Sequence, residues 1–208
     1  EAGREEDAGE EGLMEAAARA RAVVDFWFLP ADHPGHGTYR IEWFRKDDAF
    51  DAAIRQRFGA DVEAALSVPA GAESDEALLA RILLLDQFTR NIYRDTPRAF
   101  AGDVQALALS ETLVAAGRDK NLTPWQRWFA YLPFEHSESL LDQERCVALF
   151  AALRREMQHE AFDNAHDYAV RHREVIARFG RFPHRNTILG RESTAEEIEF
   201  RKQPGSSF

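Results

Sequence analysis

The sequence predicts an all-α fold, and three observations lead to this prediction. Apolar residues recur every three or four positions over long windows, as they do in amphipathic helices, and no stretch shows the alternation of a half-buried strand. Residues that favour helix starts and helix ends stand at the matching positions. With 208 residues and 45% apolar content, the chain can bury one substantial core, so we expect a single compact domain over residues 13–208.

Eight helices are expected from the apolar periodicity. They cover residues 13–28, 47–66, 75–92, 103–117, 124–135, 139–158, 161–179 and 194–202. Capping residues support three of the starts. Ser74 precedes "DEALLA", Thr123 precedes a proline at the first helical position, and Ser193 with Glu196 has the spacing of a capping box.

The links between these helices are short, and glycines mark several of them. Gly59, Gly117 and Gly180 stand where helices are expected to stop or turn. Short links predict antiparallel helical hairpins that stack on one another, in a tetratricopeptide-like arrangement. The sequence has no clear period near the ~34 residues of a tetratricopeptide array, so any repeat is expected to be degenerate.

The first twelve residues differ from the rest of the chain. The stretch "EAGREEDAGEEG" holds six acidic residues and one arginine, and it accounts for half of the formal net charge of −10. It contains no aromatic or branched aliphatic residue to bury, so we expect residues 1–12 to form a disordered acidic tail.

Composition also limits the partners and the compartment. The body of the chain is mildly acidic, which argues against broad binding to nucleic acid. A single cysteine, Cys146, cannot form an intramolecular disulfide and suits a reducing compartment. It lies on an apolar stripe, where a packing role is favoured. No leader peptide and no membrane span are recognised, so a cytoplasmic protein that does not contact membranes is expected.

Several polar residues continue the apolar stripes of the expected helices. In the helix over 139–158 the stripe through Cys146 and Phe150 reaches back to Asp142 and then to Glu138. His172 lies in the middle of the apolar face of the next helix. The stripe of the helix over 75–92 ends in polar residues on two neighbouring strips, Asp86 with Arg90 and Gln87 with Asn91.

An arginine-rich segment follows the helix that carries His172. Within "ARFGRFPHRNTILGRE" stand Arg178, Arg181, Arg185 and Arg191, together with His184 and Asn186. Charges that face a core are costly unless they are paired, hydrogen-bonded or open to a wet cleft. We therefore expect this segment to close over the internal carboxylates and to bind them through guanidinium groups.

Four longer motifs resemble one known family. "VVDFWFLP", "LLLDQFTRNIYRDTPRAFAGD", "YLPFEHSESLLDQE" and "RFGRFPHRNTILGRESTAEE" are similar to the bacterial domain-of-unknown-function family nine-two-four, from about Val23 to the C-terminal end. The resemblance implies stacked, tetratricopeptide-like helical hairpins and a cytoplasmic bacterial protein. It implies no reaction and no catalytic residues.

Two functions are left open by these observations. The first is a helical-hairpin module that binds a peptide or protein, and this is the function that we favour from sequence. The second is a site for an anionic small molecule, either a binding site or an enzyme, in which Arg181 and Arg185 hold the anion and His172 or His184 carries a proton. A structural ion-pair network is the alternative to any site, and unpaired arginine charge would distinguish the two.

The candidate ligand-binding residues share one property: each is expected in or beside the internal polar cluster. They are Asp86, Gln87, Arg90, Asn91, His136, Glu138, Asp142, His172, Arg181, His184, Arg185, Asn186 and Arg191. A metal site built from His136, Glu138, Asp142 and His172 has only a weak signal. We therefore expect no metal and no cofactor, and the sequence does not decide whether the protein is an enzyme.

Overall fold

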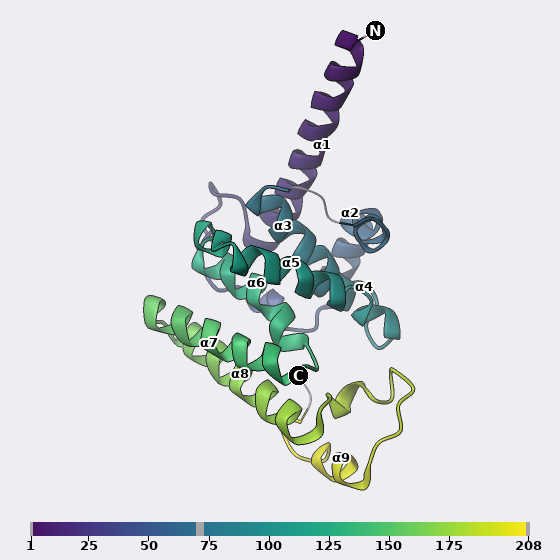
Figure 1. Cartoon of the computed structure of the whole chain (residues 1–208), viewed down its shortest axis with the longest axis vertical. Coiled ribbons are helices and arrows are strands. Elements are labelled where there is room, and N and C mark those ends of the chain that lie inside the picture. The colour runs from purple at the N-terminus through teal and green to yellow at the C-terminus, as the bar shows by residue number, and fades with distance from the viewer. Residues whose placement is uncertain (1, 70–72, 207–208) are drawn as a thin grey trace.

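The computed structural model describes residues 2–69 and 73–206, and these residues form an all-helical fold without strands (Figure 1). Its α-helices are α1 (Ala2–Phe28), α2 (Asp48–Ser67), α3 (Asp75–Ile82), α4 (Thr89–Ile92), α5 (Asp103–Ala115), α6 (Pro124–His136), α7 (Leu140–Met157), α8 (Glu160–Phe179) and α9 (Ala195–Phe200). Four short 3-10 helices are η1 (Ile41–Trp43), η3 (Pro97–Phe100), η4 (Arg118–Asn121) and η5 (Pro183–Arg185). A π-helical segment, η2 (Leu83–Phe88), joins α3 to α4.

The eight expected helices are confirmed, with most boundaries shifted by a few residues. The segment expected as one helix over 75–92 is helical throughout, but η2 interrupts its α-helical hydrogen bonding. Periodicity does not reveal this segment, since every residue from Leu83 to Phe88 is buried and the run has no exposed face. A π-turn changes the direction in which side chains point, and such turns are frequent at functional sites.

Helix α1 starts earlier than expected. It includes residues 2–12, for which the acidic composition predicts a disordered tail, and Glu1 lies outside the described residues. Alanine and glutamate in this stretch favour helix, and the N-terminal part of α1 projects away from the body (Figure 1). Disorder of this stretch in solution stays a prediction, which amide hydrogen exchange would test.

The cap predictions are confirmed at two helix starts. Ser74 accepts a hydrogen bond from the Ala77 amide, and Thr123 forms a capping box with Gln126. The predicted box of Ser193 and Glu196 is wrong by one residue, because Thr194 and Glu197 form it.

The glycine predictions are confirmed at two of three positions. Gly117 and Gly180 both have a φ of 67°, which glycine adopts readily. Gly59 lies inside α2 and does not end it, because the buried stripe of Phe58 and Val62 continues on both sides.

The central element is the run α3–η2–α4. Helix α3 packs against α1, α5 and α6, and η2 packs against α2, α5 and α6. Aromatic side chains fill the space around it, and the Trp27 ring contacts those of Phe88 and Phe129, with all three fully buried. Because polar residues of η2 also face this interior, the fold must satisfy them with partners from other helices.

The second half of the chain forms a helical layer and a long C-terminal segment. Helix α6 packs against α7, and α7 packs against α8 (Figure 1). The C-terminal segment, residues 180–206, leaves α8 as a wide loop and is anchored by a small apolar cluster around Ile176 and Phe182. Its η5 turn approaches the start of α5. In the described part of the chain, no helix combines the length and apolar character needed to cross a membrane.

Candidate functional site

The first pair of the site joins η2 to the end of α6. Asp86 is fully buried, and its Oδ1 lies 2.7 Å from Nδ1 of His136. Its Oδ2 accepts a hydrogen bond of 2.7 Å from Nε2 of Gln87. Burial alone would raise the pKa of Asp86, but His136 and Arg90 together hold it well below its ordinary value. Asp86 is therefore a carboxylate that can only accept hydrogen bonds.

A second pair joins α4 to the start of α5. Arg90 donates from Nη1 and Nη2 to both carboxylate oxygens of Asp103, at 2.8 and 3.0 Å, and Nη1 also donates to the Asp86 carbonyl at 2.7 Å. Close packing sets this geometry, because a Cβ at Gly102 would lie 2.2 Å from the Leu85 carbonyl oxygen. The absence of a side chain at Gly102 thus lets α5 reach η2 and present Asp103 to Arg90.

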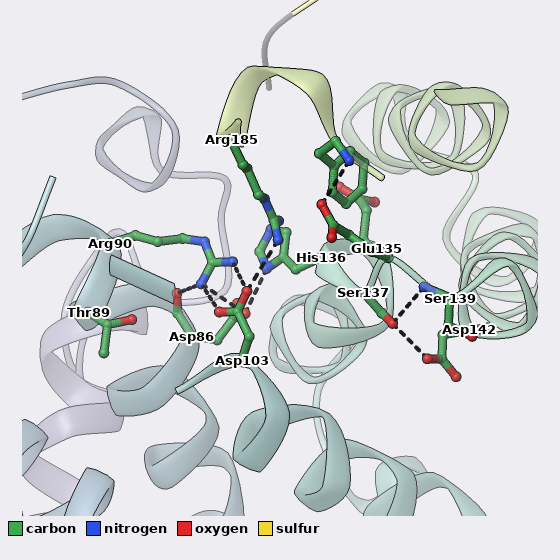
Figure 2. A network of polar contacts seen from close by, with 12 residues as sticks. Asp86, Thr89, Arg90, Asp103, Glu135, His136, Ser137, Ser139, Asp142 and Arg185 are labelled. Atoms are coloured by element: carbon green, nitrogen blue, oxygen red, sulfur yellow. Dashed lines mark hydrogen bonds and ion pairs between the residues drawn. The ribbon is translucent and has the colours of Figure 1, made fainter. Parts of the chain in front are cut away.

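Arg185 enters the same cluster from η5 (Figure 2). Its guanidinium carbon lies 4.8 Å from the ring centre of Phe100 and 4.6 Å from that of Phe182, so it is held between two aromatic rings. It forms an ion pair with Asp103 through a long contact of 3.4 Å from Nη1 to Oδ2, an oxygen that Arg90 already uses. Its Nε is buried and has no hydrogen-bond acceptor among the residues that the structure describes.

The electrostatics separate Arg185 from Arg90. Burial opposes the charge on both, but Asp86 and Asp103 raise the pKa of Arg90. In contrast, burial and the nearby Arg90 together lower the pKa of Arg185 to about 10. A lowered arginine pKa means that its positive charge lacks sufficient counter-charge. Arg185 is therefore charged at neutral pH but only partly neutralised.

A deeper, less charged region adjoins this pair. Burial raises the pKa of Glu135 to about 8, with a further contribution from Asp86, so Glu135 is mainly protonated at neutral pH. Its Oε1 lies 3.6 Å from Nδ1 of His172, which contacts the Tyr168 carbonyl at 2.8 Å. Burial lowers the pKa of His172 to about 3. Burial also raises the pKa of the Cys146 thiol, which is fully buried as a packing residue.

An outer ion-pair network holds the C-terminal segment in place. Arg191 donates to both oxygens of Glu138, at 2.7 and 2.9 Å, and also to Asn186. Arg181 binds Glu197, and Arg178 binds Glu196 near the surface. The expectation that arginines of this segment meet internal carboxylates is thus correct for Glu138, while Asp103, Glu196 and Glu197 are partners that it did not name.

Two expected members lie elsewhere. Asp142 does not meet an arginine among the described residues, and it instead accepts a hydrogen bond of 2.7 Å from Ser137 (Figure 2). The buried residue at this helix start is Gln143, which donates to backbone carbonyls at the end of α6. Asn91 binds Asp51 and lines a separate surface pocket of about 290 Å³ between α2 and α4.

Arg181 and Arg185, which were expected to hold an anion together, do not face the same site. Arg185 faces the cluster, whereas Arg181 is occupied by Glu197 and the Glu192 carbonyl. His184 stands beside Arg185 in η5, and burial lowers its pKa to about 4. The histidine in contact with the buried carboxylate is His136, although His172 and His184 were the expected proton carriers.

Sequence reasoning missed three members of the site, Asp103, Glu135 and Phe100. Glu135 had a signal, because steps of three along α6 lead from Phe129 through Leu132 to Glu135. No sequence signal pointed to Asp103 and Phe100, since their positions depend on the close approach of Gly102 to η2. The described residues contain no group of three or more histidines, cysteines or acids arranged to hold a metal ion.

Taken together, the site contains the ion pair of Arg90 and Asp103, the buried Asp86 carboxylate, a partly neutralised Arg185, neutral histidines and a protonated acid. The side chains of Arg90, Asp103 and His136 remain 20%, 19% and 16% exposed, so the cluster reaches solvent along one edge. A partly open polar site with several strongly perturbed pKa values is suited to holding an anion and to moving protons.

Comparison with known proteins places most of the chain in one family. The family described as "Bacterial protein of unknown function (DUF924)" matches residues 23–205. A solved structure, that of the protein of unknown function ATU0120 from Agrobacterium tumefaciens, is similar with a TM-score of 0.71 and 34% identity, over 89% of this chain and 98% of that one. The search of curated proteins finds no match. The chain belongs to the bacterial family DUF924.

Proposed function

We propose that the protein binds a small anionic molecule through the guanidinium group of Arg185, with Arg90 and His136 at the edge of the same site. The observation that supports this most directly is the incomplete pairing of Arg185. Its Nε has no acceptor among the described side chains and backbone groups, and its contact with Asp103 is long. A carboxylate or phosphate oxygen would supply the missing acceptor and counter-charge.

The aromatic neighbours of Arg185 support the same proposal. Phe100 and Phe182 pack against the guanidinium and restrict its motion, which lowers the entropy lost when the group binds a ligand. They also displace water from its faces, so an anion at the guanidinium edge would interact in a less polar environment. An arginine required only for stability would gain more from a direct bidentate pair of the kind that Arg191 forms with Glu138.

Thermal unfolding with added phosphate or acetate tests the proposal, at ionic strength matched with sodium chloride. A ligand at ten times its Kd stabilises the folded state by about 1.4 kcal/mol, which raises Tm by several degrees. We expect this rise in the wild type and in Arg178→Gln, which alters a surface ion pair of the same segment. Arg185→Gln is expected to lose it. A Tm that neither anion changes, or that rises equally in Arg185→Gln, would contradict the proposal.

A second candidate function, recognition of a peptide or protein, is favoured by an exposed aromatic surface. Tyr39 and Phe44 are 44% and 50% exposed, their rings stack at 6.1 Å, and both make edge contacts with the Trp43 ring. For this function we propose that the hairpins formed by α6, α7 and α8 stack in a tetratricopeptide-like manner and that the protein works in the bacterial cytoplasm.

Co-purification with the full chain as bait tests this second candidate. A partner that the wild type retains and Phe44→Ser loses would support it. Leu141→Ser is a suitable control, because it removes another exposed apolar side chain on a different helix. Partners retained equally by both variants, or the absence of a stable partner, would count against a role for this surface.

A further inference from the structure

The contact between Asp86 and His136 determines where the proton of the imidazole lies. The Asp86 carboxylate can only accept, so at 2.7 Å the Nδ1 of His136 must carry the hydrogen and donate it. Burial and Arg90 lower the pKa of His136, although Asp86 opposes them, and the ring is therefore neutral at pH 7. The lone pair of a neutral ring with hydrogen on Nδ1 is on Nε2.

The buried carboxylate is itself held firmly. Gln87 donates to Oδ2 at 2.7 Å, and Nη1 of Arg90 lies 3.3 Å from Oδ1. Gln87 lies beside Asp86 in η2 and Arg90 follows in α4, so the positions of both neighbours are coupled to that of Asp86. His136 is the last residue of α6 and reaches from this buried acceptor to the partly exposed edge of the site.

We propose that Nε2 of His136 acts as a general base toward the anion held by Arg185 or toward a water molecule beside it, with Asp86 as its positioning residue. This inference rests on the proposed anion site. The substrate class is a small carboxylate or phosphate compound that undergoes proton removal or attack by water. In proton removal, a C–H or O–H bond of the substrate breaks, its electron pair stays on carbon or oxygen, and an N–H bond forms at Nε2. In attack by water on an ester of this class, the proton of water moves to Nε2 while the water oxygen bonds to the carbonyl carbon or phosphorus. The bond to the leaving oxygen then breaks, and Nε2 returns the proton to that oxygen.

The surrounding charges favour this step when the anion is present. The charged or titratable groups that face His136 from the packed elements are Asp86, Arg90, Asp103, Glu135, His172, His184 and Arg185. Asp86 and Asp103 neutralise Arg90 but Arg185 only in part, so these groups oppose another positive charge on His136. A bound anion would add negative charge near His136 and raise its pKa toward 7, which would make the imidazole a more effective base. Asp86 would then stabilise the imidazolium that forms.

Hydrolysis of 4-acetoxybenzoate tests the inference, because this ester carries a carboxylate that Arg185 can hold and a neutral imidazole promotes attack of water on its acetyl group. We expect the wild type to exceed His136→Gln by at least about tenfold at pH 7, a modest part of the usual contribution of a general base. His33→Gln removes a histidine from the loop between α1 and η1 and is expected to match the wild type. Equal rates for the wild type and His136→Gln would overturn the inference.

Nitrogen-15 NMR of the histidine rings separates a positioning role of Asp86 from a purely structural one. In the wild type we expect His136 to carry its proton on Nδ1. Asp86→Asn can donate to Nδ1, so a larger share of rings is expected to carry the proton on Nε2, with a lower rate. An Nε2-protonated ring in the wild type would overturn the inference even if the variants fold poorly.

The two proposals fail in different ways. If phosphate raises Tm through Arg185 but ester hydrolysis does not depend on His136, the site binds an anion without catalysing proton transfer. If His136-dependent hydrolysis occurs but neither phosphate nor acetate changes Tm, the anion site is wrong, and with it the substrate class inferred here.

Discussion

Arg90 and Asp103 form a two-pronged ion pair, with guanidinium nitrogens 2.8 and 3.0 Å from the two carboxylate oxygens. The pair joins α4 to the first residue of α5 and shares Asp103 with Arg185 from η5. One carboxylate therefore stabilises two cations that come from distant parts of the sequence. The stability of the site and its capacity for an anion both depend on this sharing.

Replacing Asp103 by Asn should destabilise the protein strongly. The change leaves two largely buried guanidinium groups without their common negative charge, and removal of one partner of a buried pair costs about 3–5 kcal/mol. Since Asp103 and Arg90 are about one-fifth exposed, we expect about 2–4 kcal/mol, reduced by solvent screening. Urea unfolding measures the change. Glu196→Gln, in an exposed pair with Arg178, should cost much less, and equal losses in the two variants would contradict the role of Asp103.

Replacing Gly102 by Ala should disturb the same ion pair without removing any charge. The new Cβ would lie 2.2 Å from the Leu85 carbonyl oxygen, so the start of α5 must shift away from η2. Gly59→Ala is a matched control, because its Cβ meets no atom within 4 Å in the middle of α2. We expect the control to gain about 0.5–1 kcal/mol from helix propensity and Gly102→Ala to lose stability. A gain in both variants would show that the close approach is not required.

Glu135 should give the stability of the protein an unusual dependence on pH. Its folded-state pKa is raised to about 8, so the folded state holds a proton that the unfolded state releases near the ordinary glutamate value. The stabilisation from this group is complete below the unfolded pKa and is lost as pH rises to about 8, with a slope of up to about 1.4 kcal/mol per pH unit. Glu135→Gln should remove the decrease in the free energy of unfolding that the wild type shows between pH 7 and 8.

Histidines contribute the opposite slope at lower pH. The folded pKa values of His172 and His184 are lowered to about 3 and about 4, so protons bind the unfolded state first as pH falls below about 6.5. Stability should therefore decline toward acid in both the wild type and Glu135→Gln. Urea unfolding from pH 5 to 9 separates the loss of stability toward pH 8, due to Glu135, from the loss below about pH 6.5, due to the histidines. Glu144→Gln on the exposed face of α7 serves as the control. A wild type as stable at pH 8 as at pH 7 would contradict the assignment to Glu135.

The helices were predictable because their apolar stripes and caps are local properties of the sequence. Ser74 and Thr123 show this, since each caps the helix that the pattern predicts. The burial of Asp86 also followed from its place on a stripe. The same reasoning failed for Asp142, because a residue in the first turn of a helix can reach a neighbouring hydroxyl, here Ser137, without facing the core.

The partners within the site were less predictable because they depend on contacts between distant segments. The charge pattern led to the expectation that the arginine-rich segment meets internal carboxylates, and Arg191 with Glu138 shows such a contact. It did not identify Asp103, whose position is fixed by a close backbone approach, or the aromatic rings that enclose Arg185. A π-turn at Asp86 also lies beyond a pattern that assumes regular helix.

The most direct test of the central claim is the NMR signal of the Arg185 Nε–H group during titration with phosphate. This donor is buried and has no acceptor among the described residues. We predict that its proton and nitrogen shifts move with phosphate and saturate, with assignment confirmed by loss of the signal in Arg185→Lys. Shifts that stay constant to high millimolar phosphate and acetate, while Arg178 serves as an exposed reference, would contradict an anion site at Arg185.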